Sequence, residues 1–203
     1  VIGPLSRPPH LVLKRFRPQI FFVYSFVWVF GDVMTRDKFD RYATPHSVIA
    51  ALLARLDWPF DRVWEPCCGD GRLADALRAK GAEVIQHDIV TGHDFFKWGT
   101  GQASTLITNP PFRVIRQFID HAFMLGVERM ALVCNERLWA SGKGHQQWQR
   151  HRPSRFVNLT WREDYLDRGS SPDRALAISI WDRPHSPDCR YEVWTRVEEA
   201  AEC

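Results

Sequence analysis

Along the middle of the chain, the pattern of polar and apolar positions predicts strands that alternate with helices. Short apolar runs bounded by Gly, Pro or charged residues predict strands at residues 61–65, 82–86, 103–108 and 130–134. Stretches with apolar residues three and four positions apart predict amphipathic helices at residues 47–56, 72–80 and 114–124, the first with a capping start. Strands that alternate with helices are typical of a mostly parallel sheet covered by helices on both faces.

The C-terminal part of the chain changes this pattern. Residues 156–161 and 175–181 are predicted to form a closing antiparallel pair, joined by a long Gly-, Ser- and Pro-containing connection at residues 164–173. Long loops near a site often act as lids. The segment between Gln86 and Ala103 is too short for a complete helix and strand, so we expect the third strand of the sheet to be reduced or absent.

The length of 203 residues suits one α/β domain, which we expect at residues 34–203. Residues 1–33 differ in character, with several prolines and basic residues before an apolar run at residues 20–30. That run is shorter than the about 20 apolar residues of a spanning helix, and membrane association is not expected. We predict an N-terminal extension, either disordered or upstream of a true start at Met34, and keep an anchor or export signal as the alternative.

Charge and cysteine content indicate which partners and which cellular compartment to expect. Lys and Arg outnumber Asp and Glu by 27 to 24, and the net charge of +3 is compatible with a nucleic-acid partner without requiring one. The five cysteines form no C-x-x-C pair, so a reducing cytoplasm is expected. Histidines and cysteines are not spaced as zinc ligands, and we predict no metal site.

The strand predicted at residues 103–108 ends in Asn109, Pro110, Pro111 and Phe112. Prolines cannot donate ladder hydrogen bonds, so the strand stops and Asn109 lies at its carboxyl end, where open α/β sheets bind ligands. A rigid turn that offers the Asn109 side-chain oxygen, the Pro110 carbonyl and an aromatic face suits a flat amine. The alternative is an ordinary strand-ending turn.

A second segment, Glu65-Pro66-Cys67-Cys68-Gly69-Asp70-Gly71, leads from a strand through a glycine turn into a helix. The next strand is followed by the acid Asp88. This order is typical of the nucleotide-binding half of a doubly wound sheet, in which the acid accepts hydrogen bonds from ribose hydroxyls. The loop lacks the third glycine of the dinucleotide pattern, so it is informative only in combination with the turn at Asn109.

Together these segments resemble the class I S-adenosylmethionine-dependent methyltransferases, over residues 41–182. The N-P-P-F sequence is similar to the amino-methyltransferase motif of the adenine-N6 DNA branch of that family. The resemblance implies a three-layer, doubly wound, Rossmann-like sheet that is mostly parallel with an antiparallel C-terminal strand. It also implies S-adenosyl-L-methionine as the cofactor, held by Tyr42, Thr44, Pro45, Glu65, Pro66, Cys67, Gly69, Gly71, Asp88, Asp94 and Phe95.

The resemblance assigns a role to several of these residues. Thr44 would bind the cofactor's carboxylate and Glu65 its ammonium group, although a plain helix cap also explains Thr44 and Pro45. Gly69 and Gly71 would allow close approach of the cofactor, where a Cβ would collide. Asp94 and Phe95 would contact the adenine, and a turn acid beside a core Phe is the equal alternative. Cys67 and Cys68 are expected to pack rather than to act as nucleophiles, since methyl transfer needs none.

The predicted reaction is methyl transfer to an exocyclic amine, with adenine N6 in DNA favoured. Asn109 and Pro110, with Pro111 fixing the turn, would orient the amine, and Phe112 would stack on the base. RNA base amines or protein glutamine are alternative acceptors, and a catalytically silent binding module is the alternative of another class. No large target-recognition segment is visible, which favours loose specificity, a partner subunit of restriction-modification type, or a minimal phage-type enzyme.

A basic segment is the predicted DNA contact. It contains Lys143, Arg150, Arg152 and Arg155, with Trp148 as a stacking surface. Surface solvation explains the same residues nearly as well.

Overall fold

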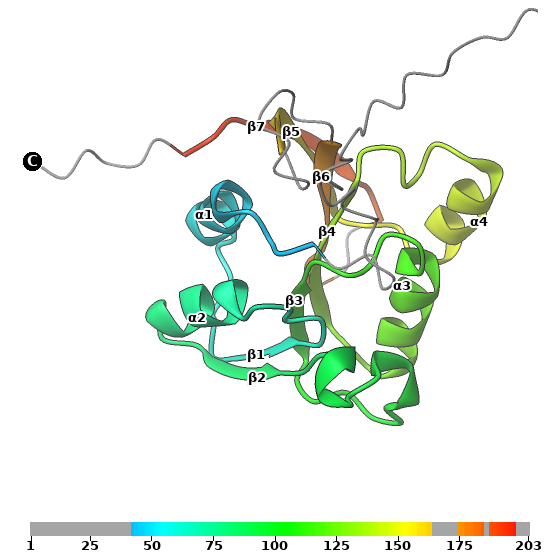
Figure 1. Cartoon of the computed structure of the whole chain (residues 1–203). Helices are drawn as coiled ribbons and strands as arrows, with labels where there is room; N and C mark the ends of the chain where they lie inside the picture. Colours follow the sequence, from blue (N-terminus) through cyan, green and yellow to red (C-terminus); the bar gives the residue numbers. More distant parts are fainter. Residues whose placement is uncertain (1–41, 164–173, 185–186, 198–203) are drawn as a thin grey trace, which may run out of the picture. The chain divides into compact units, whose positions relative to one another are not determined.

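The computed structural model describes residues 42–163, 174–184 and 187–197 (Figure 1). The extension predicted at residues 1–33, its boundary before Met34, and the connection at residues 164–173 lie outside the described residues. In chain order the elements are α1 (His46–Arg55), β1 (Arg62–Glu65), α2 (Arg72–Ala79), β2 (Glu83–Gln86), η1 (Ile89–Thr91), η2 (Phe95–Lys97), β3 (Thr105–Thr108), α3 (Ile115–Met124), β4 (Arg129–Asn135), α4 (Gly142–Arg150), β5 (Arg155–Glu163), β6 (Arg174–Trp181) and β7 (Arg190–Trp194).

The strands form one sheet of seven in the order β2-β1-β3-β4-β6-β5-β7. Strand β6 runs antiparallel to β4 and β5, and the other neighbouring strands are parallel. The predicted fold class is therefore confirmed. The chain between β2 and β3 forms only the short 3-10 turns η1 and η2, so the expected loss of a third strand is also confirmed.

Side-chain alternation along the strands creates the two hydrophobic layers. On β4, Met130 and Leu132 pack on the face covered by α3, while Val133 packs on the opposite face with α1 and α2. Successive side chains of a strand point to opposite faces, so a strand buried on both sides reads as a continuous apolar run. Figure 1 shows α1 and α2 on one side of the sheet and α3 and α4 on the other.

Two elements and one cap differ from the sequence prediction. Helix α4 was not predicted; Ser141 Oγ accepts from the Gly144 N–H at its start, and the Gln147 amide donates to Arg116 O on α3 over 2.6 Å. Strand β7 was not predicted either, and it extends the sheet by pairing with β5. The side-chain cap expected for α1 is wrong, because Pro45 occupies the cap position and has no polar side chain.

No helix in the described part of the chain is long and apolar enough to cross a membrane.

Candidate active site

The main pocket, of about 820 Å³, lies where the carboxyl ends of β1, β2 and β3 meet. These strands are adjacent and parallel, so the segments that follow them emerge at one edge of the sheet. The pocket is lined by nine of the residues predicted from sequence: Tyr42, Pro66, Cys67, Gly69, Asp88, Asp94, Phe95, Asn109 and Pro111. Six predicted residues do not line it: Thr44, Pro45, Glu65, Gly71, Pro110 and Phe112.

Asp88 ties the glycine loop to the turn after β2. Its two carboxylate oxygens accept from the backbone N–H groups of Gly69 and Val90, each over 2.9 Å. The residue is only 6% exposed, yet it lines the pocket. A carboxylate oxygen can accept more than one hydrogen bond, so Asp88 has capacity left for a hydroxyl donor in the pocket.

Gly69 and Gly71 both adopt left-handed backbone conformations, with φ of 55° and 85°. A Cβ added at either position meets no protein atom within 4 Å. The collision expected from sequence therefore does not arise within the protein itself. Glycine is required here because other L-residues are strained at positive φ.

Glu65, the last residue of β1, is fully buried. Neither of its carboxyl oxygens makes a hydrogen bond of ordinary geometry to a described residue, although the Ala74 backbone N–H lies near enough to favour the charged form. Burial raises the pKa of Glu65 to about 8, with the Arg78 guanidinium acting in the opposite direction. Buried polar groups are normally satisfied, so a buried carboxyl that lacks an ordinary hydrogen bond, at the end of a strand that leads into a ligand pocket, is compatible with a cationic ligand group.

The residues predicted to contact adenine form the turn η2. Asp94 accepts from the Phe96 N–H over 3.0 Å and so begins this turn. Phe95 is buried and stacks on Phe118, with ring centroids 3.9 Å apart. Both residues line the pocket while also serving the fold, so the geometry is compatible with both interpretations made from sequence.

Asn109 is fixed at the pocket by a hydrogen bond across 67 residues of sequence. Its side-chain nitrogen donates to the Tyr42 carbonyl over 3.0 Å. A carbonyl oxygen only accepts, so the amide must present its NH2 group to Tyr42, and its oxygen is the atom left to accept from another donor. Pro110 is buried behind this turn and Pro111 lines the pocket.

Phe112 lies beside the main pocket rather than in it. It lines a second pocket of about 450 Å³, and Arg113 and Gln117 line both pockets. Phe112 also packs against the hydrophobic layer of α1 and α2. Arg113 and Gln117 were missed from sequence, although both follow the predicted turn directly and could have been found as its neighbours.

Cys67 and Cys68 lie in the glycine loop, and neither thiol is activated as a nucleophile. Burial raises the pKa of the Cys67 thiol above its ordinary range and raises that of Cys68 to about 11, so both stay protonated near neutral pH. This agrees with the packing role expected for them. Within the ranges that the structure describes, no group of three or more His, Cys, Asp or Glu residues could hold a metal ion.

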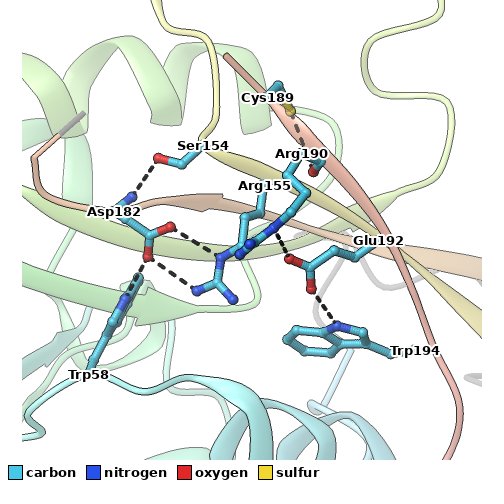
Figure 2. Close-up of polar contacts among 8 residues, drawn as sticks. All are labelled: Trp58, Ser154, Arg155, Asp182, Cys189, Arg190, Glu192 and Trp194. Carbon is cyan, nitrogen blue, oxygen red and sulfur yellow. Dashed lines mark hydrogen bonds and ion pairs between the residues drawn. The ribbon is translucent and has the colours of Figure 1, made fainter. Parts of the chain in front are cut away.

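The predicted basic DNA contact is wrong in part. Arg155 is 6% exposed and makes two 3.1 Å hydrogen bonds to Asp182, which also accepts from the Trp58 indole over 2.7 Å (Figure 2). Because this carboxylate already neutralises it in the interior, Arg155 is not available to phosphate. Arg150 lies 3.4 Å from Asp120, and Arg152 donates to Pro187 O.

The other four members of the predicted contact keep accessible surface, and Arg150 and Arg152 are exposed despite their contacts. Lys143 is exposed at the start of α4. Trp148 is half-buried, with its ring edge-on to Trp139 at 5.2 Å between centroids. Of the predicted contact residues, Arg155 is therefore the one that the structure withdraws into the interior.

The sequence matches no protein-family profile and no curated protein. The structure, in contrast, is similar to several solved methyltransferases. It matches the 23S rRNA methyltransferase ErmE at 14% identity and a TM-score of 0.53, covering 71% of each chain. It matches the modification subunit of a putative type I restriction enzyme from Vibrio vulnificus YJ016 at 12% identity and a TM-score of 0.54, covering 79% of this chain and 48% of that subunit.

A third similar structure is a putative class I S-adenosylmethionine-dependent methyltransferase from Listeria monocytogenes. It matches at 12% identity and a TM-score of 0.53, over 76% of this chain and 65% of that one. At these identities the likeness concerns the fold. The described residues therefore have the fold of the class I S-adenosylmethionine-dependent methyltransferases.

Proposed function

We propose that this protein transfers a methyl group from S-adenosylmethionine to an exocyclic amine, with adenine N6 of DNA as the acceptor. The observation that carries the proposal is the Asn109 amide. It lines the main pocket with its nitrogen engaged by Tyr42, and so offers an oxygen acceptor on the same sheet edge as the glycine loop and Asp88. An amine recognition group and a nucleotide site thus open into one pocket.

The pocket residues fit the cofactor. The volume of the main pocket, about 820 Å³, falls within the roughly 300–1,000 Å³ that is usual for small-molecule sites. Asp88 supplies an acceptor for ribose hydroxyls, and Phe95 and Asp94 supply an aromatic surface and an acceptor for an adenine. Glu65 ends β1 and does not line the main pocket, but its buried carboxyl would be ionised by an ammonium group brought next to it.

In this mechanism the chain mainly positions the acceptor. When bound, S-adenosylmethionine would supply an electrophilic methyl group on a sulfonium sulfur, and that sulfur would leave with the electron pair of the C–S bond. The Asn109 oxygen, and the backbone carbonyl of Pro110 although that residue is buried and does not line the pocket, would accept N–H bonds from the amine and orient its nitrogen. They also stabilise the positive charge that develops on the nitrogen, which then releases one proton to water.

A base amine of RNA is the second candidate acceptor. The observation in its favour is that ErmE, one of the similar structures, is an rRNA methyltransferase. The same turn at Asn109 would orient an amine on either nucleic acid.

Labelled cofactor distinguishes these outcomes. The purified chain is incubated with labelled S-adenosylmethionine and with unmethylated DNA, RNA or a protein pool in separate reactions. We expect label in DNA, recovered as N6-methyladenine. Label confined to RNA or to protein glutamine would mean that the protein is a methyltransferase with a different acceptor. Cofactor binding without transfer to any pool would mean that the protein is a non-catalytic binding module.

A further inference from the structure

The second pocket is lined by cations contributed by separate elements. Arg113 follows β3, Arg116 lies on α3, Arg137 follows β4, and Lys143 is in the first turn of α4. None of its described lining residues is acidic. We call these four residues and the 450 Å³ space between them the cationic pocket.

Most of this positive charge is not used by the fold. Arg113 and Lys143 are exposed and have no hydrogen-bond or ion-pair partner among the described residues. Arg137 lies 3.7 Å from Glu136, but its side chain is 83% exposed, and an exposed pair of this kind contributes little. Within the described part of the chain, Arg113 and Lys143 therefore carry positive charge that no acidic side chain neutralises.

The Arg116 guanidinium lines the cationic pocket in a fixed orientation. Its Nη2 donates to Leu138 O and to Ser141 Oγ, and these bonds fix the guanidinium between α3 and the start of α4. Its Nη1 is buried and finds no acceptor within residues 42–163, 174–184 and 187–197. A held guanidinium with an unsatisfied donor is well suited to a phosphate oxygen.

The cationic pocket adjoins the main pocket, because Arg113 and Gln117 line both. Phe112, which belongs to the Asn109 turn, lines the cationic pocket. A ligand that reaches both pockets would place a planar base near Asn109 and Phe112 and an anionic group a short distance away, among the four cations. A nucleotide within a strand has this combination of groups.

We infer that the cationic pocket binds the backbone phosphate of a nucleic-acid strand next to the nucleotide whose base is methylated. The inference rests on the proposed function and selects its substrate class, a polynucleotide over a protein glutamine. A glutamine side chain in a peptide is neutral, and four cations with no lining acid offer it no complementary charge. The strand is unpaired or has its target base flipped out, since a base within a duplex does not reach the Asn109 turn.

Binding without cofactor tests this inference independently of the chemistry. The affinity of the full chain for a labelled single-stranded oligonucleotide is measured by fluorescence anisotropy over a series of salt concentrations. Two pocket variants, Lys143→Glu and Arg137→Gln, are compared with two matched controls, Lys80→Glu and Arg62→Gln. Lys80 is an exposed lysine after α2, and Arg62, like Arg137, is an exposed arginine paired with a glutamate.

We expect each pocket variant to weaken binding roughly 5- to 10-fold and each control to leave it nearly unchanged. Each pocket variant should also flatten the plot of log affinity against log salt by about 0.7, the contribution of one phosphate contact on a single strand. Parallel DNA and RNA oligonucleotides show which backbone is preferred.

Equal losses in pocket and control variants would mean a general effect of net charge and would overturn the inference, as would wild-type affinity in both pocket variants. Absence of oligonucleotide binding by the wild type at low salt would overturn it as well. If the pocket variants lose oligonucleotide affinity but the wild type methylates no acceptor, the phosphate site stands and the proposed function fails.

Discussion

Glu65 is the last residue of β1 and Asp88 follows the neighbouring parallel strand β2, and the two carboxyl groups differ in their hydrogen bonds. Asp88 receives two backbone N–H bonds, whereas Glu65 is buried and neither of its oxygens makes a hydrogen bond of ordinary geometry to a described residue. The difference has a measurable consequence, because a carboxyl buried without partners holds its proton to a higher pH.

Glu65→Gln tests this state of the buried carboxyl. Because the pKa of Glu65 rises from 4.5 to about 8 on folding, the stability that its proton confers is complete below pH 4.5 and is lost as the pH rises toward 8. The slope is about 1.4 kcal/mol of unfolding free energy per pH unit in that window. Glu65→Gln should abolish this slope and be more stable than wild type near pH 8, as measured by urea denaturation without cofactor.

The comparison between Glu65→Gln and wild type isolates this one group from the histidines that titrate in the same range. Parallel stability curves for the two proteins between pH 5 and pH 8 would show that the Glu65 carboxyl is ionised or paired in the folded protein, and the predicted buried, protonated state would be wrong.

At the scale of single elements, the backbone conformation at the start of helix α2 explains why a glycine occurs there. Gly71 occupies its cap position with φ of 85°. Gly71→Ala should therefore destabilise the protein by about 1–2 kcal/mol, the cost of the left-handed conformation for an L-residue. Thermal unfolding measures the loss.

Gly142→Ala provides the matched control. Gly142 begins α4, has no positive φ, and has open space around an added Cβ. Alanine should be neutral or slightly stabilising there, because it is the better helix former. A similar loss of melting temperature in both variants would contradict the conformational explanation for Gly71.

The elements that could be predicted are those with a strong apolar period. Strands such as Thr105–Thr108 are buried on both faces, and α3 carries a clear apolar stripe. Helix α4 contains two glycines and mostly polar residues, and it is held by the Ser141 cap and by Gln147, interactions that apolar periodicity does not report. Strand β7 lies at the sheet edge, with Tyr191 and Val193 exposed, so it also lacks a buried pattern.

At the scale of the whole molecule, one ion pair joins distant parts of the chain. Arg155 on β5 pairs with Asp182 after β6, and Asp182 accepts from Trp58 between α1 and β1 (Figure 2). Local sequence does not reveal such a partner, which is why the basic segment was assigned to DNA as a unit. For the same reason, the residues of the Asn109 turn could be predicted from sequence, but the hydrogen bond from Asn109 to Tyr42 could not.

Arg155→Gln tests whether Arg155, in the basic segment predicted to contact DNA, serves the fold or binds nucleic acid. Removing the Arg155 guanidinium takes two hydrogen bonds from Asp182, which is 31% exposed and keeps its bond from Trp58, so we expect a loss of about 1–3 kcal/mol of unfolding free energy. Oligonucleotide affinity at temperatures well below unfolding should stay at the wild-type level. A large loss of affinity with little loss of stability would restore Arg155 to the nucleic-acid contact.

The central claim is that Asn109 orients the acceptor amine without holding the cofactor. The most direct measurement is the rate of N6-methyladenine formation in unmethylated DNA, by mass spectrometry, for wild type, Asn109→Ala and a control, Asn158→Ala, with cofactor affinity measured by calorimetry. Asn158 lies on β5, does not line the main pocket, and donates from its side-chain nitrogen to the Tyr191 hydroxyl. We predict that Asn109→Ala loses roughly 100- to 1,000-fold in rate while binding cofactor as tightly as wild type, and that Asn158→Ala keeps the wild-type rate. A wild-type rate in Asn109→Ala would contradict the claim.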